Sequence, residues 1–164
     1  MNDVRRRQYQ KADINDVANW FLLKGAMSHK KLQKLCYYAE AWSEALLDDS
    51  ISKNCDFQAW VHGPVNKILW DRFKEYGWNA FELIDEEAAR NSLSDKFTEE
   101  QLDVLEAVWN TYHHLSADQL EAQTHKEEPW LEKRKGLGKF QNSSRLISKK
   151  TMKDYYRTLM DEQA

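Results

Sequence analysis

The stretch from residue 29 to residue 47, HKKLQKLCYYAEAWSEALL, limits the possible folds of this chain more than any other segment. Its apolar residues recur at steps of three and four, a period that places them on one stripe of an α-helix. The stripe consists of Leu32, Leu35, Ala39, Trp42 and Leu46. Ser28 precedes the stretch, and its hydroxyl can cap a free N–H group of the first helical turn. We therefore expect a central helix that packs on several sides and organises the core.

The other faces of this helix carry most of its polar residues. The residues off the stripe are mostly Gln33, Lys34, Glu40 and Ser43. Glu40, Glu44 and Asp48 are expected to form a solvated face rather than a general acid–base pair. Tyr37 and Tyr38 project about 100° apart on a helix, so one can join the core while the other reaches the surface.

Capping and stop signals predict further helices on both sides of the central one. Asp13 can cap a first helix, which Gly25 ends. Thr98 and Ser116 each open a capping box, in which a glutamine three residues later bonds back to the capping residue. Ser148 can cap the last helix with its hydroxyl. These signals indicate a chain that is mostly helical.

A short extended segment at 57–61 leads into His62-Gly63-Pro64, and a helix is expected from about residue 65 to 76. Pro64 fixes φ and lacks an N–H, which suits the first turn of a helix. A second segment at 81–84 could pair with 57–61. The sequence therefore predicts a mainly α fold, a single compact domain of about six helices with a small two-stranded β element. The domain would span residues 13–164, after a flexible N-terminal arm at 1–12.

Composition and charge favour a soluble globular protein of the cytoplasm. Apolar residues make up 41% of the chain and charged residues 31%, a balance typical of folded domains. The net charge is −3 with both signs mixed, so no general attraction to nucleic acid is expected. The one basic run, Arg5-Arg6-Arg7, is better explained as a solvated arm. No apolar run is long enough to span a membrane, the N-terminus lacks the apolar core of a signal peptide, and two cysteines fit a reducing compartment.

The residues that could carry catalysis or bind a metal lack the required spacing. His113, His114 and His125 belong to no HExxH motif, and the chain has no CxxC pair, so neither a metal nor a cofactor is expected. Cys36 lies on the apolar side of the central helix, where a thiol packs as a small hydrophobe. The sequence favours a protein that is not an enzyme, with a small hydrolase using Cys36 or a histidine as a weaker alternative.

Three places could instead contact a partner protein. Lys30 and Lys34, with one of the neighbouring tyrosines, could bind an acidic partner or could be plain solvated surface. The turn at 62–65 is explained first as a structural turn and second as an exposed edge. Trp130 is large enough to anchor its loop in the core, which we favour, or to anchor a partner.

Four motifs in a fixed order resemble one known family. They are DVANWF at 16–21, LQKLCYYAEAW at 32–42, AWVHGPV at 59–65, and Thr124-His125 followed by Pro129-Trp130. Together they resemble the Panacea domain of SocA-like antitoxins, which often occur in phage-associated proteins. The motif residues that the resemblance marks, and for which a structural role is expected, are Leu32, Gln33, Leu35, Trp42, Trp60, Thr124, His125, Pro129 and Trp130.

The resemblance implies an antitoxin of a type II toxin–antitoxin system rather than an enzyme. Such a protein neutralises a co-encoded toxin by direct binding and steric occlusion; the alternative is an adaptor that delivers the toxin to a cellular protease. A nucleic-acid-binding regulator is less favoured, since no additional helix-turn-helix domain is evident. The residues expected at the toxin interface are Lys30, Lys34, Tyr37, Tyr38, His62, Gly63, Pro64 and Val65.

Overall fold

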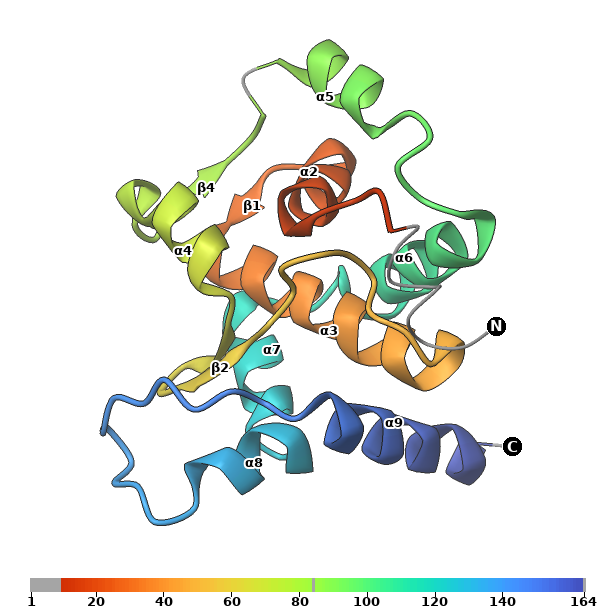
Figure 1. Ribbon diagram of the computed structural model, residues 1–164. Helices are drawn as coiled ribbons and strands as arrows, with labels where there is room; N and C mark the ends of the chain where they lie inside the picture. Colours follow the sequence, from red (N-terminus) through yellow and green to blue (C-terminus); the bar gives the residue numbers. More distant parts are fainter. Residues whose placement is uncertain (1–9, 84, 164) are drawn as a thin grey trace.

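Helix α3 (His29–Leu47) lies at the centre of the structure, a computed structural model that describes residues 10–83 and 85–163 (Figure 1). The other helices are α2 (Ile14–Lys24), α4 (Lys67–Phe73), α5 (Glu86–Leu93), α6 (Glu99–Tyr112), α7 (Ala117–Thr124), α8 (Glu128–Arg134) and α9 (Lys149–Gln163), with the 3₁₀ turn η1 (Lys74–Tyr76). The strands are β1 (Met27–Ser28), β2 (Gln58–Trp60), β3 (Gly63–Val65) and β4 (Ala80–Phe81). The mainly α class is confirmed, with eight α-helices in the described residues where about six were predicted.

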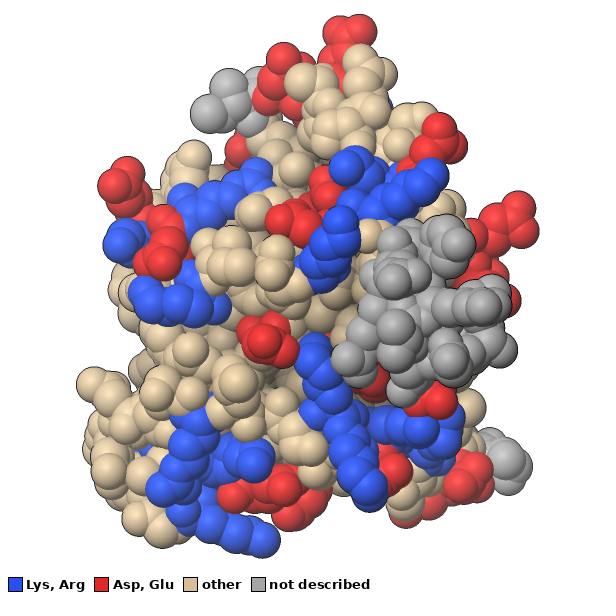
Figure 2. All heavy atoms as spheres, viewed as in Figure 1, with Lys and Arg blue, Asp and Glu red and all other residues tan. Residues whose placement is uncertain are grey.

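The prediction that α3 packs on several sides is confirmed. Helices α6 and α9 pack most extensively against it, and α2, α4 and α7 also contact it (Figure 1). Leu32, Leu35 and Ala39 of the predicted stripe are fully buried. None of the helices in the described part of the chain is long and apolar enough to cross a membrane. On the face shown in Figure 2, basic and acidic side chains are interspersed.

The solvated face predicted for Glu40, Glu44 and Asp48 is wrong for the first two, and only Asp48 is exposed. Gln33, Lys34, Glu40 and Ser43 are all buried, and so is Glu44, whereas Leu46 of the apolar stripe is 45% exposed. The physical reason is that segments distant in sequence supply partners for the polar groups. Periodicity identifies apolar side chains, but it carries no information about such partners.

The clearest case is Glu40, whose carboxylate is fully buried between α3, α9 and the loop that follows α3. Lys149 at the start of α9 forms an ion pair with it. The Cys55 thiol donates to Glu40 Oε2 at 2.9 Å, and the Ile51 N–H donates to Oε1 at 3.1 Å. Burial raises the pKa of Glu40, and the Lys149 ammonium opposes that effect. The ion pair therefore holds a charge in the core that would otherwise be costly.

The short strands pair differently from the prediction. Strand β2 forms an antiparallel hairpin with β3, in which Ala59 lies opposite Pro64, while β4 pairs with β1. The predicted pairing of 57–61 with 81–84 is therefore wrong, and so is the placement of Pro64 in a helical turn. Helix α4 begins only at Lys67, where the Asn66 side chain caps it by accepting from the Leu69 N–H. A turn of two residues at 61–62 allows β2 and β3 to pair as a local hairpin.

The predicted helix caps are confirmed. The side chains of Asp13, Ser28, Thr98, Ser116 and Ser148 all accept hydrogen bonds from the first turns of the helices that follow them. Residues 1–9 of the predicted arm, with the arginine run at 5–7, lie outside the described residues. Ala12, at the end of that arm, is buried, and its carbonyl accepts from the Lys53 N–H at 2.9 Å.

Glu44 provides a test of stability against pH. Burial, and then the Glu40 charge, raise its pKa from 4.5 to about 7, although the Ser50 hydroxyl donates to its Oε1 at 2.9 Å. The folded state therefore binds the Glu44 proton more tightly than the unfolded chain. This contribution to stability is complete below pH 4.5 and is lost as the pH rises through about 7.

The variant Glu44→Gln is expected to melt a few degrees above the wild type at pH 8 and close to it at pH 4.5. Thermal unfolding followed by circular dichroism between these pH values measures the difference. If the melting temperatures of the two proteins differed by the same amount at every pH, titration of Glu44 would not be the cause of the difference.

Candidate functional site

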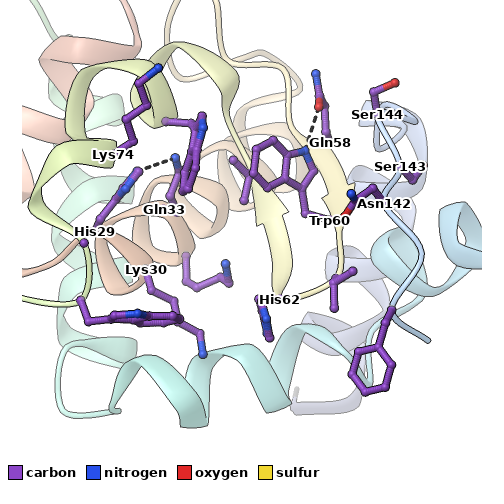
Figure 3. Close-up of a pocket in the computed structure, with 17 residues that line it drawn as sticks. His29, Lys30, Gln33, Gln58, Trp60, His62, Lys74, Asn142, Ser143 and Ser144 are labelled. Atoms are coloured by element: carbon purple, nitrogen blue, oxygen red, sulfur yellow. Dashed lines mark hydrogen bonds between the residues drawn. The ribbon is translucent and has the colours of Figure 1, made fainter. Parts of the chain in front are cut away.

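A groove of about 970 Å³ opens beside the N-terminal half of α3 (Figure 3). Its walls come from α3, the β2–β3 hairpin, α4 with the segment after it, and residues 140–144. The residues that line it are His29, Lys30, Gln33, Lys34, Gln58, Trp60, Val61, His62, Val65, Trp70, Lys74, Gly77, Trp78, Phe140, Asn142, Ser143 and Ser144. The groove is therefore built by segments that are distant in sequence, from residue 29 to residue 144.

Aromatic side chains form much of the groove wall. The rings of Trp60 and Trp70 meet edge to face with centroids 5.2 Å apart, and His29 stacks on Trp70 at 5.3 Å. Trp78 is 79% exposed and Phe140 is 77% exposed. Large aromatic side chains that remain in water beside a groove are typical of protein interaction surfaces.

The charged residues that line the groove are all basic. Lys30 contacts Asp118 at 2.8 Å and Glu121 at 3.4 Å, and His62 Nδ1 lies 2.6 Å from a Glu121 oxygen. Figure 3 shows Lys30 on α3 and His62 on the hairpin at the same part of the groove. Burial, and then the Lys34 charge, lower the pKa of His29 to about 4, so this ring is neutral at pH 7.

Lys34 lies under the hairpin and is 1% exposed. Its Nζ donates one hydrogen bond, to the Pro64 carbonyl at 3.3 Å. Burial, and then the charge of Lys30, lower the pKa of Lys34 to about 7, while Glu121 acts in the opposite direction. The close approach requires a glycine at position 63, because a Cβ there would lie 2.6 Å from Lys34 Cε.

The separate sequence motifs meet around this groove. Gln33 Oε1 accepts from the Asn66 N–H at 2.9 Å, which joins α3 to the end of the hairpin. The Trp130 indole donates to the Trp60 carbonyl at 2.8 Å, and the His125 ring stacks on Trp130 at 3.9 Å. Pro129 lies in the first turn of α8. These contacts attach α7 and α8 to the hairpin.

The structure brings together only some of the predicted interface residues. Lys30, Lys34, His62 and Val65 line the groove, whereas Gly63 and Pro64 are buried in the hairpin beside it. The expectation that one of two adjacent tyrosines reaches the surface is wrong, because Tyr37 and Tyr38 are both fully buried.

A buried hydrogen-bond network explains why both tyrosines lie inside. The Tyr38 hydroxyl donates to Glu127 at 2.8 Å, and the Tyr156 hydroxyl donates to the same oxygen at 2.8 Å. The hydroxyls of Tyr37 and Tyr156 lie 3.2 Å apart. The network connects α3 to α8 and α9, and it provides polar partners that a helical projection cannot reveal.

Sequence reasoning missed the rim of the groove. Trp70, Lys74 and Trp78 come from α4 and the segment after it, and Phe140 lies in the long connection before α9. Neither the segment after α4 nor the connection before α9 has a periodic pattern of apolar residues. The available signal was an aromatic residue next to a glycine turn in an otherwise polar segment, as at Gly77-Trp78.

The two thiols of the described chain are poor nucleophiles at neutral pH. Cys36 and Cys55 are buried, and burial raises the pKa of both thiols, that of Cys55 to about 12. Both therefore stay protonated at neutral pH, whereas the thiolate is the reactive form. In the described part of the chain, no group of three or more His, Cys, Asp or Glu side chains could hold a metal ion.

Comparison with known protein families identifies a match. The family model described as antitoxin SocA-like, Panacea domain, matches residues 32–131. This span begins in α3, includes the hairpin and ends within α8, so it contains the motifs that meet at the groove. No curated protein and no solved structure matches the chain.

Proposed function

The chain belongs to the SocA-like antitoxin family that the Panacea domain defines, and from this premise we propose that it neutralises a co-encoded protein toxin by binding it directly. The family match over residues 32–131 is the observation that carries the proposal. The mechanism is steric, since a preformed helical protein covers the surface with which the toxin acts. An interface of ordinary size, about 800 Å² on each partner, is sufficient.

The groove beside α3 is the docking surface in this proposal. Trp78 and Phe140 offer large apolar surfaces in water, and the walls between them are aromatic. Burying a few such side chains supplies most of the binding free energy at protein interfaces. A toxin segment with apolar side chains would cover both rings at once.

The buried, protonated thiols support binding rather than catalysis, because they remove Cys36 as a nucleophile. The alternative mechanism, delivery of the toxin to a protease, differs in what happens to the toxin after binding. Occlusion leaves the lifetime of the toxin unchanged, whereas delivery shortens it.

The experiment is co-expression of the chain with the product of the adjacent gene in a bacterial host. We expect restored growth, co-purification of the two proteins and an unchanged toxin lifetime. The double variant Trp78→Ser/Phe140→Ser is expected to weaken the complex by about thirtyfold or more, the effect of losing one strong interface anchor.

Leu46→Ser is the matched control, because Leu46 is an exposed apolar residue at the opposite end of α3. It should bind the toxin like the wild type. Toxic growth arrest in the presence of the wild-type chain, without a complex, would disprove the proposal. A shortened toxin lifetime that depends on a host protease would replace occlusion by delivery.

A further inference from the structure

Lys34 is a buried cation that lacks an acidic partner within the described protein. Buried charges are normally paired, because removing them from water is costly. A lysine ammonium has three donors, and Lys34 uses one of them, in the long hydrogen bond to Pro64. Within residues 10–83 and 85–163, no carboxylate lies within 4 Å of its Nζ, whereas Lys30 has two and Lys74, which also lines the groove, has one.

Lys34 lies in the wall of the groove, although only 1% of it is exposed. It is among the lining residues, and none of those residues carries a carboxylate. At the nearby edge, Glu121 already contacts both Lys30 and His62. These contacts of Glu121 show that the basic side chains of the groove can bind a carboxylate.

We infer that the groove is a receptor for an acidic segment, and that an Asp or Glu side chain of the toxin enters it and pairs with Lys34. As a toxin contact, this inference rests on the proposed function. The aromatic walls from Trp60 and Trp70 exclude water around the pair and so strengthen it. The neighbouring apolar side chains of the segment would contact Trp78 and Phe140.

The groups around Lys34 predict how binding depends on pH. Those that face it are His29 and Lys30 on α3, His62 on the hairpin, and Glu121 and His125 at the end of α7. Since the pKa of Lys34 is about 7 in the free protein, half of the molecules lack its charge at that pH. Pairing with a carboxylate then takes up a proton, so affinity should fall roughly tenfold between pH 7 and pH 8.5.

Lys34→Met separates a binding role from a structural one. Methionine has a similar length without the charge, so the variant should be more stable than the wild type at pH 7 and below. The sign follows because burial lowers the pKa of Lys34 from 10.5, a cost that is fully present below about 7. The same variant should bind the toxin roughly thirtyfold more weakly and lose the pH dependence.

Glu121→Gln should change affinity in the opposite direction. It removes the carboxylate that competes for Lys30 and His62, so binding of an acidic segment should tighten at pH 6 and below, where the lower pKa of Lys34 without Glu121 matters least. Lys67→Met is the matched control, because Lys67 is an exposed lysine on α4 that does not line the groove. It should leave affinity nearly unchanged.

Two probes complete the test: the purified product of the adjacent gene, and a peptide of alternating glutamate and leucine with its glutamine counterpart. If the wild type and Lys34→Met bind the toxin equally at all pH values, the inference is wrong while the antitoxin proposal stands. If the wild type does not bind the toxin, the antitoxin proposal is wrong. The peptides then test separately whether the groove binds an acidic segment. Tryptophan fluorescence should then report binding of the glutamate peptide to the wild type and not to Lys34→Met. Equal binding of both peptides would overturn the acidic-segment receptor.

Discussion

Replacing Lys149 by methionine is expected to destabilise the protein by about 3–5 kcal/mol at pH 7, because the Glu40 carboxylate would remain buried without its cation. Glu40 has no exposure to solvent, and its other partners, the Cys55 thiol and the Ile51 N–H, are neutral donors. Urea unfolding followed by circular dichroism measures the change. The deficit should shrink as the pH falls, since protonation of Glu40 removes the unpaired charge.

Two companion variants identify the cause. Lys150→Met removes the next lysine of α9, which is 85% exposed and paired with Asp154 on the surface, and it should cost less than about 1 kcal/mol. The double variant Glu40→Gln/Lys149→Met removes both charges, so it should recover much of the stability lost in the single variant. A Lys149→Met protein within 1 kcal/mol of the wild type would mean that the core tolerates the unpaired carboxylate, contrary to this account.

Gly63→Ala is expected to cost about 2–4 kcal/mol, the sum of backbone strain and a steric clash. Gly63 has φ +105°, a conformation that side chains disfavour, and an added Cβ would lie 2.6 Å from Lys34 Cε and 3.0 Å from Thr124 Oγ1. Lys34 must therefore move, and we expect toxin binding to weaken together with stability. Thermal unfolding and co-purification measure the two effects.

Gly77→Ala provides the comparison for the clash. Gly77 also has a positive φ, +59°, but nothing lies within 4 Å of its Cβ position, so only the backbone strain should remain, about 1–3 kcal/mol. Shortening Lys34 to alanine in the Gly63→Ala background should recover part of the stability, because it removes the closest clashing atom, Lys34 Cε, and leaves the contact with Thr124 Oγ1. Equal losses for the two glycine variants would argue that the contact between Gly63 and Lys34 is unimportant.

The parts of the fold that were predictable from sequence depend on neighbours in sequence. The cap of α6 needs only Thr98 and Gln101, three residues apart, and the stripe on α3 needs only its own period. The burial of Glu40 depends on Lys149, and that of Tyr38 depends on Glu127. No local pattern reports partners at such distances along the chain.

Only part of the groove was predictable, because only part of it lies in segments that have a local sequence pattern. Lys30, Lys34 and His62 stood out because they adjoin strong motifs, whereas the rim formed by Trp78 and Phe140 lies in connections without periodicity. The hairpin was mispredicted because the proline signal for a helix start competes with a two-residue turn. Tertiary pairing of Gln58 with Leu146 further holds β2 as a strand.

The dependence of α3 on α9 has a consequence for the order of events during synthesis. The central helix emerges from the ribosome long before Lys149 and Tyr156, which complete its polar contacts. Until then the nascent chain carries an unpaired carboxylate and an uncovered aromatic face in its middle. Folding of this domain should therefore wait until α9 has been synthesised, and chains that stop before residue 149 should be substrates for quality control.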